Sequence, residues 1–367
     1  MRRALIPILV SMLVVAQPAS AADWTVAGAG FGHGVGFSQF GAYGMAQNGA
    51  GYRRILAQYY RGARVDNVGG RTIRVLLRER ASRVTFSGAV RIATKAARPD
   101  RRYVATRLAG RRVRVKGVGT FDAPLVVRAH ADGVRLYGRQ LNGVRDGRYR
   151  TSVEISPAGP RGLAAVNALP IDAYVRGVVA GEMPASWDLE ALKAQAVVAR
   201  SYALTTDAGG DLFDQYPDTR SQVYRGIAGE TARTNRAVNG TAGEVLTYRG
   251  AVATTYYHST SGGQTESVEY GFPGGAAVPY LRAVQDPTDR ISPYHRWTER
   301  FTQKQMQRRL RGIVRGRLRA IRVTKRGVSP RAVEVEVRGT KGARTVSGAA
   351  IRDRLDLRST WFRVARR

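Results

Sequence analysis

The sequence predicts an α+β fold, and two patterns in it support this prediction. Apolar and polar residues alternate through successive segments between about residues 70 and 156, as in strands that bury one face. Helical spacing of apolar residues occurs on both sides of that region, in residues 38–60 and 170–206. We therefore expect one domain over residues 22–367, with a β-rich subregion at 70–156.

The first 21 residues have the composition of a secretory signal peptide. Arg2 and Arg3 supply the positive charge, and residues 4–15 form an apolar run that is short for a membrane span. Small residues at 19–21 suit a cleavage site after Ala21. We expect a secreted protein of the cell wall or periplasm; a retained membrane anchor is the less favoured alternative.

The chain carries a formal net charge of +33 and has no cysteine. The missing cysteines exclude disulfides and thiolate metal ligands. The positive charge predicts attraction to a polyanion, and export argues against nucleic acid as that partner. We favour anionic polymers of the cell envelope; the alternative is a solvated surface whose arginine content reflects GC-rich coding.

The N-terminal elements are expected to be one short strand and two helices. Residues 23–29 alternate weakly and predict the strand. Ser38 can cap a helix that ends near residue 47, and apolar spacing predicts a second helix over 52–60.

Helices are predicted again after the β-rich subregion. One helix begins at Pro170 and ends near Val179, and a longer one covers residues 187–206. Because Pro184 cannot continue a helix, Glu182 is expected on a turn between the two.

The last third of the chain is expected to mix strands with short helices. Helices are predicted near residues 303–311 and within 342–359. Strands are predicted at 222–226, 244–250, 251–259, 320–326, 332–339 and 360–365.

Alternate glycines from Gly28 to Gly36 surround His33 near the N-terminus. Their G-x-G-x-G spacing does not fit the G-x-G-x-x-G of a dinucleotide loop, so close approach of the backbone to another backbone or a ligand is the better interpretation. His33 could share a metal with His258 or His295, but the sequence has no H-E-x-x-H motif or close histidine pair, and a lone histidine is more often structural.

Two serines follow His258 but lack the motifs of serine hydrolases. Neighbouring residues of a strand point to opposite faces, so His258 is badly placed to activate Ser259. Ser259 and Ser261 are better candidates for hydrogen bonds to a polar ligand than for nucleophiles.

Glu182 is the best candidate for a general acid. Met183, Pro184 and Trp187 predict partly apolar surroundings, and desolvation raises a glutamate pKa from roughly 4.3 toward neutrality. Glycosidic cleavage requires such an acid. On pattern alone, a glutamate in a surface turn is the more common case.

Several separate motifs together resemble the SpoIID/LytB family. They are VNALPIDAYVRGVVAGEMPASWDLEALKAQAVVARSYAL, DTRSQVYRG, YYHSTSGGQTES, PYLRAVQD, GHGVGFSQFGAYGMAQNG and ILAQYYRG. The resemblance implies an α+β domain with mixed and antiparallel sheets and a two-helix segment that contains the E-M-P motif. It also implies a peptidoglycan lytic transglycosylase or, alternatively, a non-catalytic enhancer of an N-acetylmuramoyl-L-alanine amidase. A structural polyanion-binding protein is a third hypothesis, which needs only the charge.

The resemblance implies that Glu182 of E-M-P is the acid and base. It would protonate the oxygen between N-acetylmuramic acid and N-acetylglucosamine, and then take the proton of the muramic C6 hydroxyl as that hydroxyl closes a 1,6-anhydro ring. One carboxyl can serve both steps, so a second carboxylate is not required. Residues expected to line the glycan, each of which could instead make a structural hydrogen bond, are His33, Ser38, Gln39, Gln222, Tyr224, His258, Ser259, Ser261 and Gly262.

The chain departs from the family pattern in two respects. In some members, cysteines near D-T-x-x-Q-V-Y help to bind zinc; here Ser221 occupies such a position, so we expect no zinc and no other cofactor. The GHGVG motif usually follows an L-R-S-T-W-F strand, whereas here LRSTWFRV ends at residue 364. This order resembles a circular permutation, so residues 24–31 should neighbour 361–364, and 32–39 should face Glu182.

Overall fold

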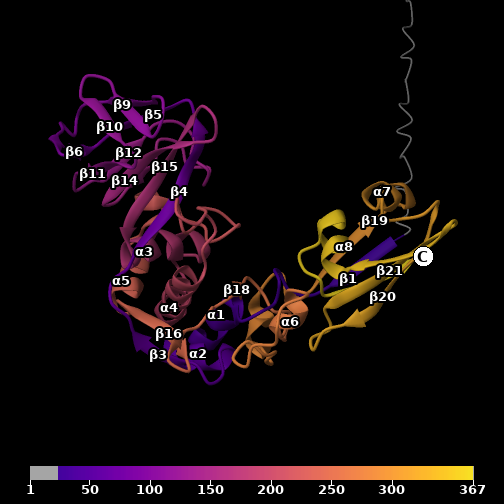
Figure 1. The fold of residues 1–367 in the computed structure, drawn as a ribbon. Helices are drawn as coiled ribbons and strands as arrows, with labels where there is room; N and C mark the ends of the chain where they lie inside the picture. The colour runs from indigo at the N-terminus through magenta and orange to yellow at the C-terminus, as the bar shows by residue number, and fades with distance from the viewer. Residues whose placement is uncertain (1–23, 367) are drawn as a thin grey trace, which may run out of the picture.

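Residues 24–366, the part of the chain that this computed structural model describes, confirm the predicted α+β class. Mostly antiparallel sheets combine there with eight α-helices, in three parts (Figure 1). A β-rich arm (residues 72–170) and a C-terminal arm (24–28 with 297–366) stand on either side of a central part (31–67 with 171–292). The predicted signal peptide, residues 1–21, lies outside the described residues.

The β-rich arm contains two six-stranded sheets, as the alternating sequence predicts. Buried and exposed residues alternate clearly in Arg112–Val115, where Val113 and Val115 are buried and the arginines are exposed. The strand orders are β10-β9-β8-β5-β12-β13 and β4-β15-β14-β11-β6-β7. The bounds are β4 Thr72–Ala81, β5 Arg83–Ser87, β6 Ala89–Ile92, β7 Lys95–Ala96, β8 Tyr103–Arg107, β9 Arg112–Val115, β10 Gly119–Asp122, β11 Leu125–Ala129, β12 Val134–Leu136, β13 Arg148–Tyr149, β14 Ser152–Ala158 and β15 Gly162–Pro170.

The β-rich arm extends beyond the predicted limit of residue 156, because β15 follows β14 as its antiparallel neighbour. Strand β15 lies between β4 and β14 and is buried on both faces. Its sequence GLAAVNALP therefore shows a continuous apolar run instead of alternation, and such a run does not distinguish a central strand from a helix.

Helix α3 (Ile171–Glu182) ends three residues later than predicted, so Glu182 is its last residue. The prediction of Glu182 on a turn was therefore wrong. Proline disfavours the helical conformation in the residue before it, and Met183 is extended, with φ −128° and ψ 144°. Consequently Pro184 ends the helix at Glu182.

The central part packs further helices around α4 (Leu189–Thr205), the long helix that the sequence predicts. Predicted helices 38–47 and 52–60 are confirmed as α1 and α2, and Ser38 caps α1 by accepting a hydrogen bond from Gly41 N. The remaining elements are α1 Gln39–Gln47, α2 Tyr52–Tyr59, α5 Ala232–Asn239, α6 Val268–Gly271, the 3-10 helices η1 Gly226–Gly229 and η2 Pro287–Ile291, and strands β2 Phe37–Ser38, β3 Arg64–Asn67, β16 Glu244–Tyr248, β17 Ala251–Val252 and β18 Tyr257–His258.

Two strands predicted in the central part are wrong or incomplete. Residues 222–225 are irregular and lead into η1, because Gly226 has a φ of +63° and turns the chain where a side chain would meet Arg148 O. The predicted strand 251–259 is divided into the short strands β17 and β18. The prediction at 244–250 is confirmed by β16.

The C-terminal arm has a hydrophobic core of its own, whereas the β-rich arm and the central part share another. The predicted helices and strands are confirmed there, and β19 and β22 are additional strands. The residues of β22 are nearly all exposed and therefore lack an apolar pattern. The elements are β19 Trp297–Phe301, α7 Gln303–Arg309, β20 Leu318–Arg326, β21 Ala332–Gly339, β22 Gly342–Ser347, α8 Gly348–Leu355 and β23 Phe362–Arg366.

Strand β1 (Trp24–Gly28) joins this C-terminal arm although it comes first in the chain. It lies between β19 and β23, with Trp24 opposite Arg366 and Gly28 opposite Phe362. Farther along, Ala29 N donates to Trp361 O at 3.0 Å. The predicted proximity of residues 24–31 and 361–364 is therefore confirmed.

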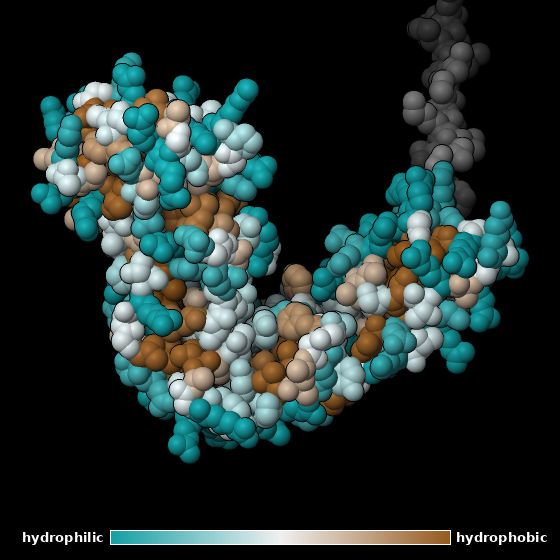
Figure 2. All heavy atoms as spheres, in the orientation of Figure 1, coloured by the Kyte–Doolittle hydropathy of each residue, from teal (hydrophilic) through white to brown (hydrophobic). Residues whose placement is uncertain are grey.

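The surface is hollowed between the two arms, above the central part (Figure 2). Hydrophilic residues cover most of the visible outer surface of both arms. Among the helices of residues 24–366, none has the length and apolar character needed to cross a membrane.

Substituting Gly28 should destabilise the C-terminal arm. A Cβ at this position would lie 2.2 Å from the Trp297 ring and 2.5 Å from Trp361 O. We expect G28A to lower the free energy of unfolding by about 1–3 kcal/mol through overpacking, as measured by chemical denaturation. The matched control is G69A, because nothing lies within 4 Å of that position; equal stability of the two variants would contradict the β1 packing.

Candidate functional site

The Glu182 carboxylate lies at the end of α3 and accepts two hydrogen bonds on one oxygen. Val223 N donates to Oε1 at 2.7 Å, and the Tyr257 hydroxyl donates to the same atom at 3.0 Å. Val223 belongs to the irregular segment before η1, and Tyr257 to β18. Three separate segments of the chain thus meet at this carboxyl group.

A chain of buried side chains orients the Tyr257 hydroxyl. The Tyr174 hydroxyl donates to Gln222 Oε1 at 3.1 Å, and Gln222 Nε2 donates to the Tyr257 oxygen at 3.1 Å. Since the Tyr257 oxygen accepts a hydrogen bond from Gln222, its own hydroxyl proton is directed to Glu182. Gln222 is fully buried, so this order of donors is built into the core.

Gln39 connects the N-terminal segment to the same site. Its Nε2 donates to the Glu182 main-chain oxygen at 3.3 Å and to Gln195 Oε1 of α4 at 3.2 Å. Gln39 is the first residue of α1, directly after the capping residue Ser38. Gln39, the last residue of segment 32–39, therefore reaches Glu182, so the prediction that this segment faces Glu182 is confirmed at Gln39.

The surroundings of Glu182 favour its neutral form. Burial raises the pKa of Glu182 above its usual range, while hydrogen bonds from Val223 N, Tyr257 and Gln39 act against this shift. Burial also raises the pKa of Tyr257 well above 10, so its hydroxyl remains a neutral donor. The group is thus an acid whose charged form is partly stabilised by fixed donors.

His33 and His258 form a pair instead of contacting Glu182 directly. Their ring centroids are 5.4 Å apart; Val35 N donates to His33 Nδ1 at 3.0 Å, and His258 Nδ1 donates to Val35 O at 3.2 Å. Burial and the nearby Arg331 guanidinium lower the pKa of His33 to about 4, and burial also depresses the pKa of His258. Both rings are neutral at pH 7.

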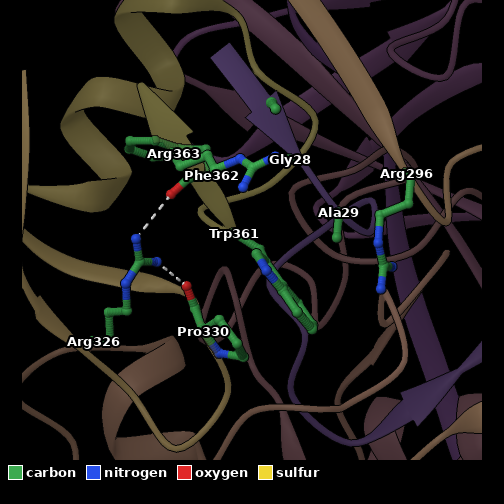
Figure 3. Close-up of a pocket in the computed structure, with 9 residues that line it drawn as sticks. Gly28, Ala29, Arg296, Arg326, Pro330, Trp361, Phe362 and Arg363 are labelled. Atoms are coloured by element: carbon green, nitrogen blue, oxygen red, sulfur yellow. Dashed lines mark hydrogen bonds between the residues drawn. The ribbon is translucent and has the colours of Figure 1, made fainter. Parts of the chain in front are cut away.

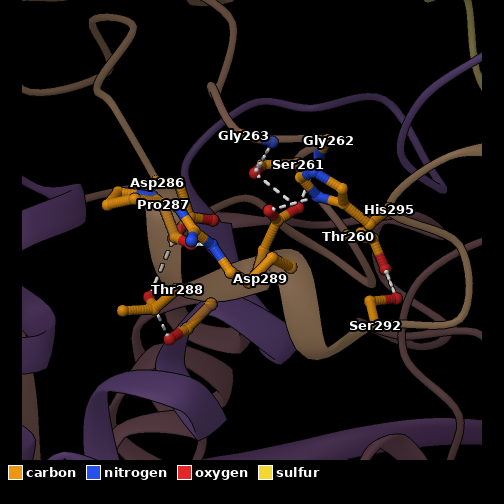
Figure 4. A network of polar contacts seen from close by, with 12 residues as sticks. Thr260, Ser261, Gly262, Gly263, Asp286, Pro287, Thr288, Asp289, Ser292 and His295 are labelled. Atoms are coloured by element: carbon orange, nitrogen blue, oxygen red, sulfur yellow. Dashed lines mark hydrogen bonds and ion pairs between the residues drawn. The ribbon is translucent and has the colours of Figure 1, made fainter.

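Ser261 and Gly262 belong to a different network, which is centred on the buried Asp289 (Figure 4). Ser261 Oγ donates to Asp289 Oδ2 at 2.9 Å, and Gly262 N donates to the same oxygen at 2.6 Å. His295 Nδ1 lies 2.8 Å from Asp289 Oδ1. Because the aspartate separates the serine from the histidine, the order is not that of a hydrolase triad.

Ser259 and Tyr224 also make structural contacts. Ser259 Oγ lies 3.3 Å from Thr260 Oγ1, and the buried Tyr224 hydroxyl donates to Asn167 Oδ1 at 2.6 Å. The Tyr224 ring packs on Tyr174, with centroids 5.2 Å apart. Tyr224 thereby holds the segment that carries Gln222 and Val223.

The structure therefore brings Gln39 and Gln222 to Glu182 and places the other candidates in adjoining networks. Sequence analysis missed Tyr257, Val223 N and Tyr174. Tyr257 lies beside His258 in the quoted YYHS motif, and the alternation of a strand gives these two side chains opposite faces. That alternation is the signal that could have identified Tyr257.

Ser221 occupies the position at which the resemblance to the SpoIID/LytB family implies a zinc-binding cysteine in some members. Ser221 Oγ accepts a hydrogen bond from Tyr216 N at 3.1 Å, and a neutral hydroxyl is not a usual zinc ligand. Within residues 24–366, no group of three or more His, Asp and Glu side chains is placed to hold a metal ion. These residues do not fit zinc.

Comparison with known proteins identifies relatives of two regions. Residues 160–248, which include α3 and α4, match the family SpoIID, described as Stage II sporulation protein; residues 280–367 match a domain of unknown function (DUF8618). The amidase enhancer of Bacillus subtilis (strain 168) is 35% identical over 194 residues, which cover 49% of this chain and 26% of that protein.

Stage II sporulation protein D of the same organism is 33% identical over 217 residues, which cover 54% of this chain and 61% of that protein. Stage II sporulation protein D of Bacillus amyloliquefaciens is 32% identical over 214 residues, 54% of this chain and 60% of that protein. The chain thus spans less than two thirds of each of these relatives.

Removing the Tyr257 hydroxyl should raise the pKa of Glu182 further. Y257F deletes one donor to Oε1, so the carboxylate form loses a hydrogen bond that stabilises it. We expect a higher Glu182 pKa in a carbon-13 NMR titration of the labelled glutamate. Y256F, which alters the neighbouring tyrosine, is the control and should leave this pKa unchanged; an unchanged pKa in Y257F would contradict the assigned contact.

Protonation of His33 should destabilise the fold in acid. Its folded pKa of about 4 lies below the unfolded value near 6.5, so the unfolded state binds the proton first as pH falls, and stability decreases between these values. The full difference is up to about 3 kcal/mol. H33N, whose side-chain oxygen can still accept from Val35 N, should lose less stability than the wild type between pH 6.5 and 4 in denaturant titrations.

Protonation of Asp286 changes the stability of the fold in the opposite direction over the same pH range. Burial raises its pKa to about 6, so its protonation in the folded state adds stability as pH falls. The test is therefore the difference between wild type and H33N, which contains the same Asp286. Parallel stability curves for the two proteins would argue against a depressed His33 pKa.

Proposed function

Because residues 160–248 match the SpoIID family, we propose that the chain is an exported peptidoglycan lytic transglycosylase with Glu182 as its acid and base. The observation that carries the proposal is the Glu182 carboxyl group, whose pKa is raised by burial and whose Oε1 accepts hydrogen bonds from two fixed donors. Its substrate would be the glycan strand of alternating N-acetylglucosamine and N-acetylmuramic acid. The protein would act in the cell wall or periplasm.

The first proposed step is proton transfer from Glu182 to the glycosidic oxygen. Since both donors point at Oε1, the acidic proton of the neutral carboxyl group resides on Oε2. As the bond from the muramic C1 to this oxygen breaks, negative charge develops on the carboxylate. Val223 N and the Tyr257 hydroxyl are already oriented to stabilise that charge, so little reorganisation is needed.

The second proposed step returns the proton to Glu182. The carboxylate takes the proton of the muramic C6 hydroxyl while its oxygen bonds to C1 and closes the 1,6-anhydro ring. One proton leaves the glutamate and one comes back, so no water is consumed and the neutral acid is regenerated. Opposing effects of burial and hydrogen bonding on the Glu182 pKa suit a group that must act in both forms.

Several chain features support a role for the neighbouring residues in this proposal. Gln39 would fix Glu182, and Gln222 would fix the donor Tyr257. Tyr257 is thereby added to the residues predicted from the sequence. The reaction needs no cofactor, because one carboxyl group performs both proton transfers. The excess of positive charge would help to attract anionic polymers of the envelope.

The similarity to a protein named amidase enhancer supports a second candidate function. In this alternative, the chain binds the cell wall without chemistry and increases the activity of an N-acetylmuramoyl-L-alanine amidase. The buried acid would then have only a structural role. An assay of the two activities side by side distinguishes the candidates.

Replacing Glu182 should abolish glycan cleavage. The full chain without its signal peptide would be incubated with glycan strands stripped of stem peptides, and 1,6-anhydro products would be measured by mass spectrometry. We expect E182Q to be about 10²–10⁴-fold slower, because it cannot donate or accept the proton. E79Q, at an exposed glutamate in the β-rich arm, is the control and should retain full activity.

Two results would contradict the enzyme. Absence of anhydro products with the folded wild type, on stripped and on intact strands, would exclude the proposed reaction. If wild type and E182Q increase the activity of the amidase equally and neither releases anhydro products, the enhancer function is favoured.

A further inference from the structure

A cavity of about 360 Å³ lies where the end of β1 meets the start of β23 (Figure 3). Residues 27–29 at the end of β1 and 361–363 at the start of β23 form part of its wall. Arg296, Arg326 and Pro330 complete the lining. This volume falls within the range of roughly 300–1,000 Å³ that is typical of ligand pockets.

Three arginines of the lining contact main-chain oxygens or solvent instead of carboxylates. Arg326 donates to Pro330 O and, at 3.3 Å, to Phe362 O; Arg296 Nη1 donates to Gly262 O and His295 O at 2.9 and 2.8 Å. Arg363, the third arginine, is exposed. Ion pairs in the described C-terminal arm use other cations, such as Lys325 with Glu334, and none of these three.

These contacts orient the guanidinium groups without neutralising them. Each guanidinium has five N–H donors, so donors remain available after the main-chain bonds are made. Burial lowers the pKa of Arg326, with no acidic neighbour to offset the desolvation. A partly desolvated arginine group of this kind favours a carboxylate or phosphate ligand, which can accept two parallel hydrogen bonds.

Trp361 supplies an aromatic surface between these arginines. Figure 3 shows Arg326 and Arg363 toward one side of the indole and Arg296 toward the other. The guanidinium carbons of Arg296 and of the buried Arg331 lie 5.7 and 5.5 Å from the ring centroid. An indole in a ligand pocket can stack against the apolar C–H face of a pyranose ring, whereas a simple inorganic anion has no such face.

We propose that this cavity binds an acidic glycan, with the sugar ring against Trp361 and its carboxylate on Arg326 and Arg363. The combination of an aromatic ring with unneutralised arginines carries the assignment. It gives the C-terminal arm, and with it the domain of unknown function, a binding role separate from Glu182. The site is independent of the proposed cleavage reaction.

The test is binding of a defined acidic oligosaccharide to the full chain without its signal peptide. The probe is a hexamer of galacturonic acid, and binding is measured by calorimetry at 0.15 M salt. A neutral cellulose hexamer tests the need for the carboxylates, and a short polyphosphate tests the need for the sugar ring. We expect the galacturonate hexamer to bind at least about tenfold more tightly than either comparison probe.

Substitutions separate this site from the general positive charge of the chain. R363Q should weaken galacturonate binding about threefold, and the double variant R326Q/R363Q about tenfold or more. W361L should also weaken it. The matched control is R319Q/R322Q, which removes two exposed arginines of the same arm that do not line the cavity.

Several outcomes would overturn the assignment. They are equal weakening by the control pair, equal affinity for the polyphosphate or the neutral hexamer, and no binding by the folded wild type. R363Q keeps the test valid if R326Q disturbs the fold, since Arg363 is exposed and melting temperatures report folding of each variant. E182Q should bind the galacturonate hexamer as the wild type does, so failure of this site and failure of the cleavage reaction are distinguishable.

Discussion

The insertion of β1 between β19 and β23 is the constraint on which much of the structure depends. It fixes the start of the described chain in the C-terminal arm, so the next residues must cross to the central part before α1 begins. The alternate glycines make this crossing. Gly30 and Gly36 have φ values of +76° and +71°, and a Cβ on Gly36 would lie 2.2 Å from Tyr256 O. The segment therefore follows residues 256–261 closely enough to deliver Gln39 to Glu182.

Glu182 then depends on two opposing effects of its surroundings. Packing at the end of α3 desolvates the carboxyl group, while donors from the 222–226 segment and β18 stabilise its anion. The Tyr257 donor is itself fixed, because Gln222 accepts a hydrogen bond from Tyr174 and donates one to Tyr257. A change in any of these buried contacts should alter the acid, although only Tyr257 and Val223 contact its carboxyl oxygen.

Local patterns in the sequence predicted the parts of the fold that they determine. Alternation identified the strands around β9, and the GHGVG and LRSTWF motifs identified the pairing of β1 with β23. Strand β15 was missed because burial on both faces removes alternation, and β22 because exposure on both faces does the same. The donors to Glu182 come from segments about 41 and 75 residues away, so their convergence is a property of tertiary packing that no local period contains.

The net charge calculated from a sequence does not say what each arginine contacts, whereas the structure does. The arginines that produce +33 have different roles once their partners are known. Arg200 is buried and pairs with Asp172 at 2.7 Å, which assigns it to the stability of the central part. Arg326 is bound to main-chain oxygens and has no carboxylate, so its charge is available to a ligand. Long-range charge attracts any polyanion and is screened within about 8 Å at physiological salt, whereas a ring and two oriented guanidinium groups select the shape of what is bound.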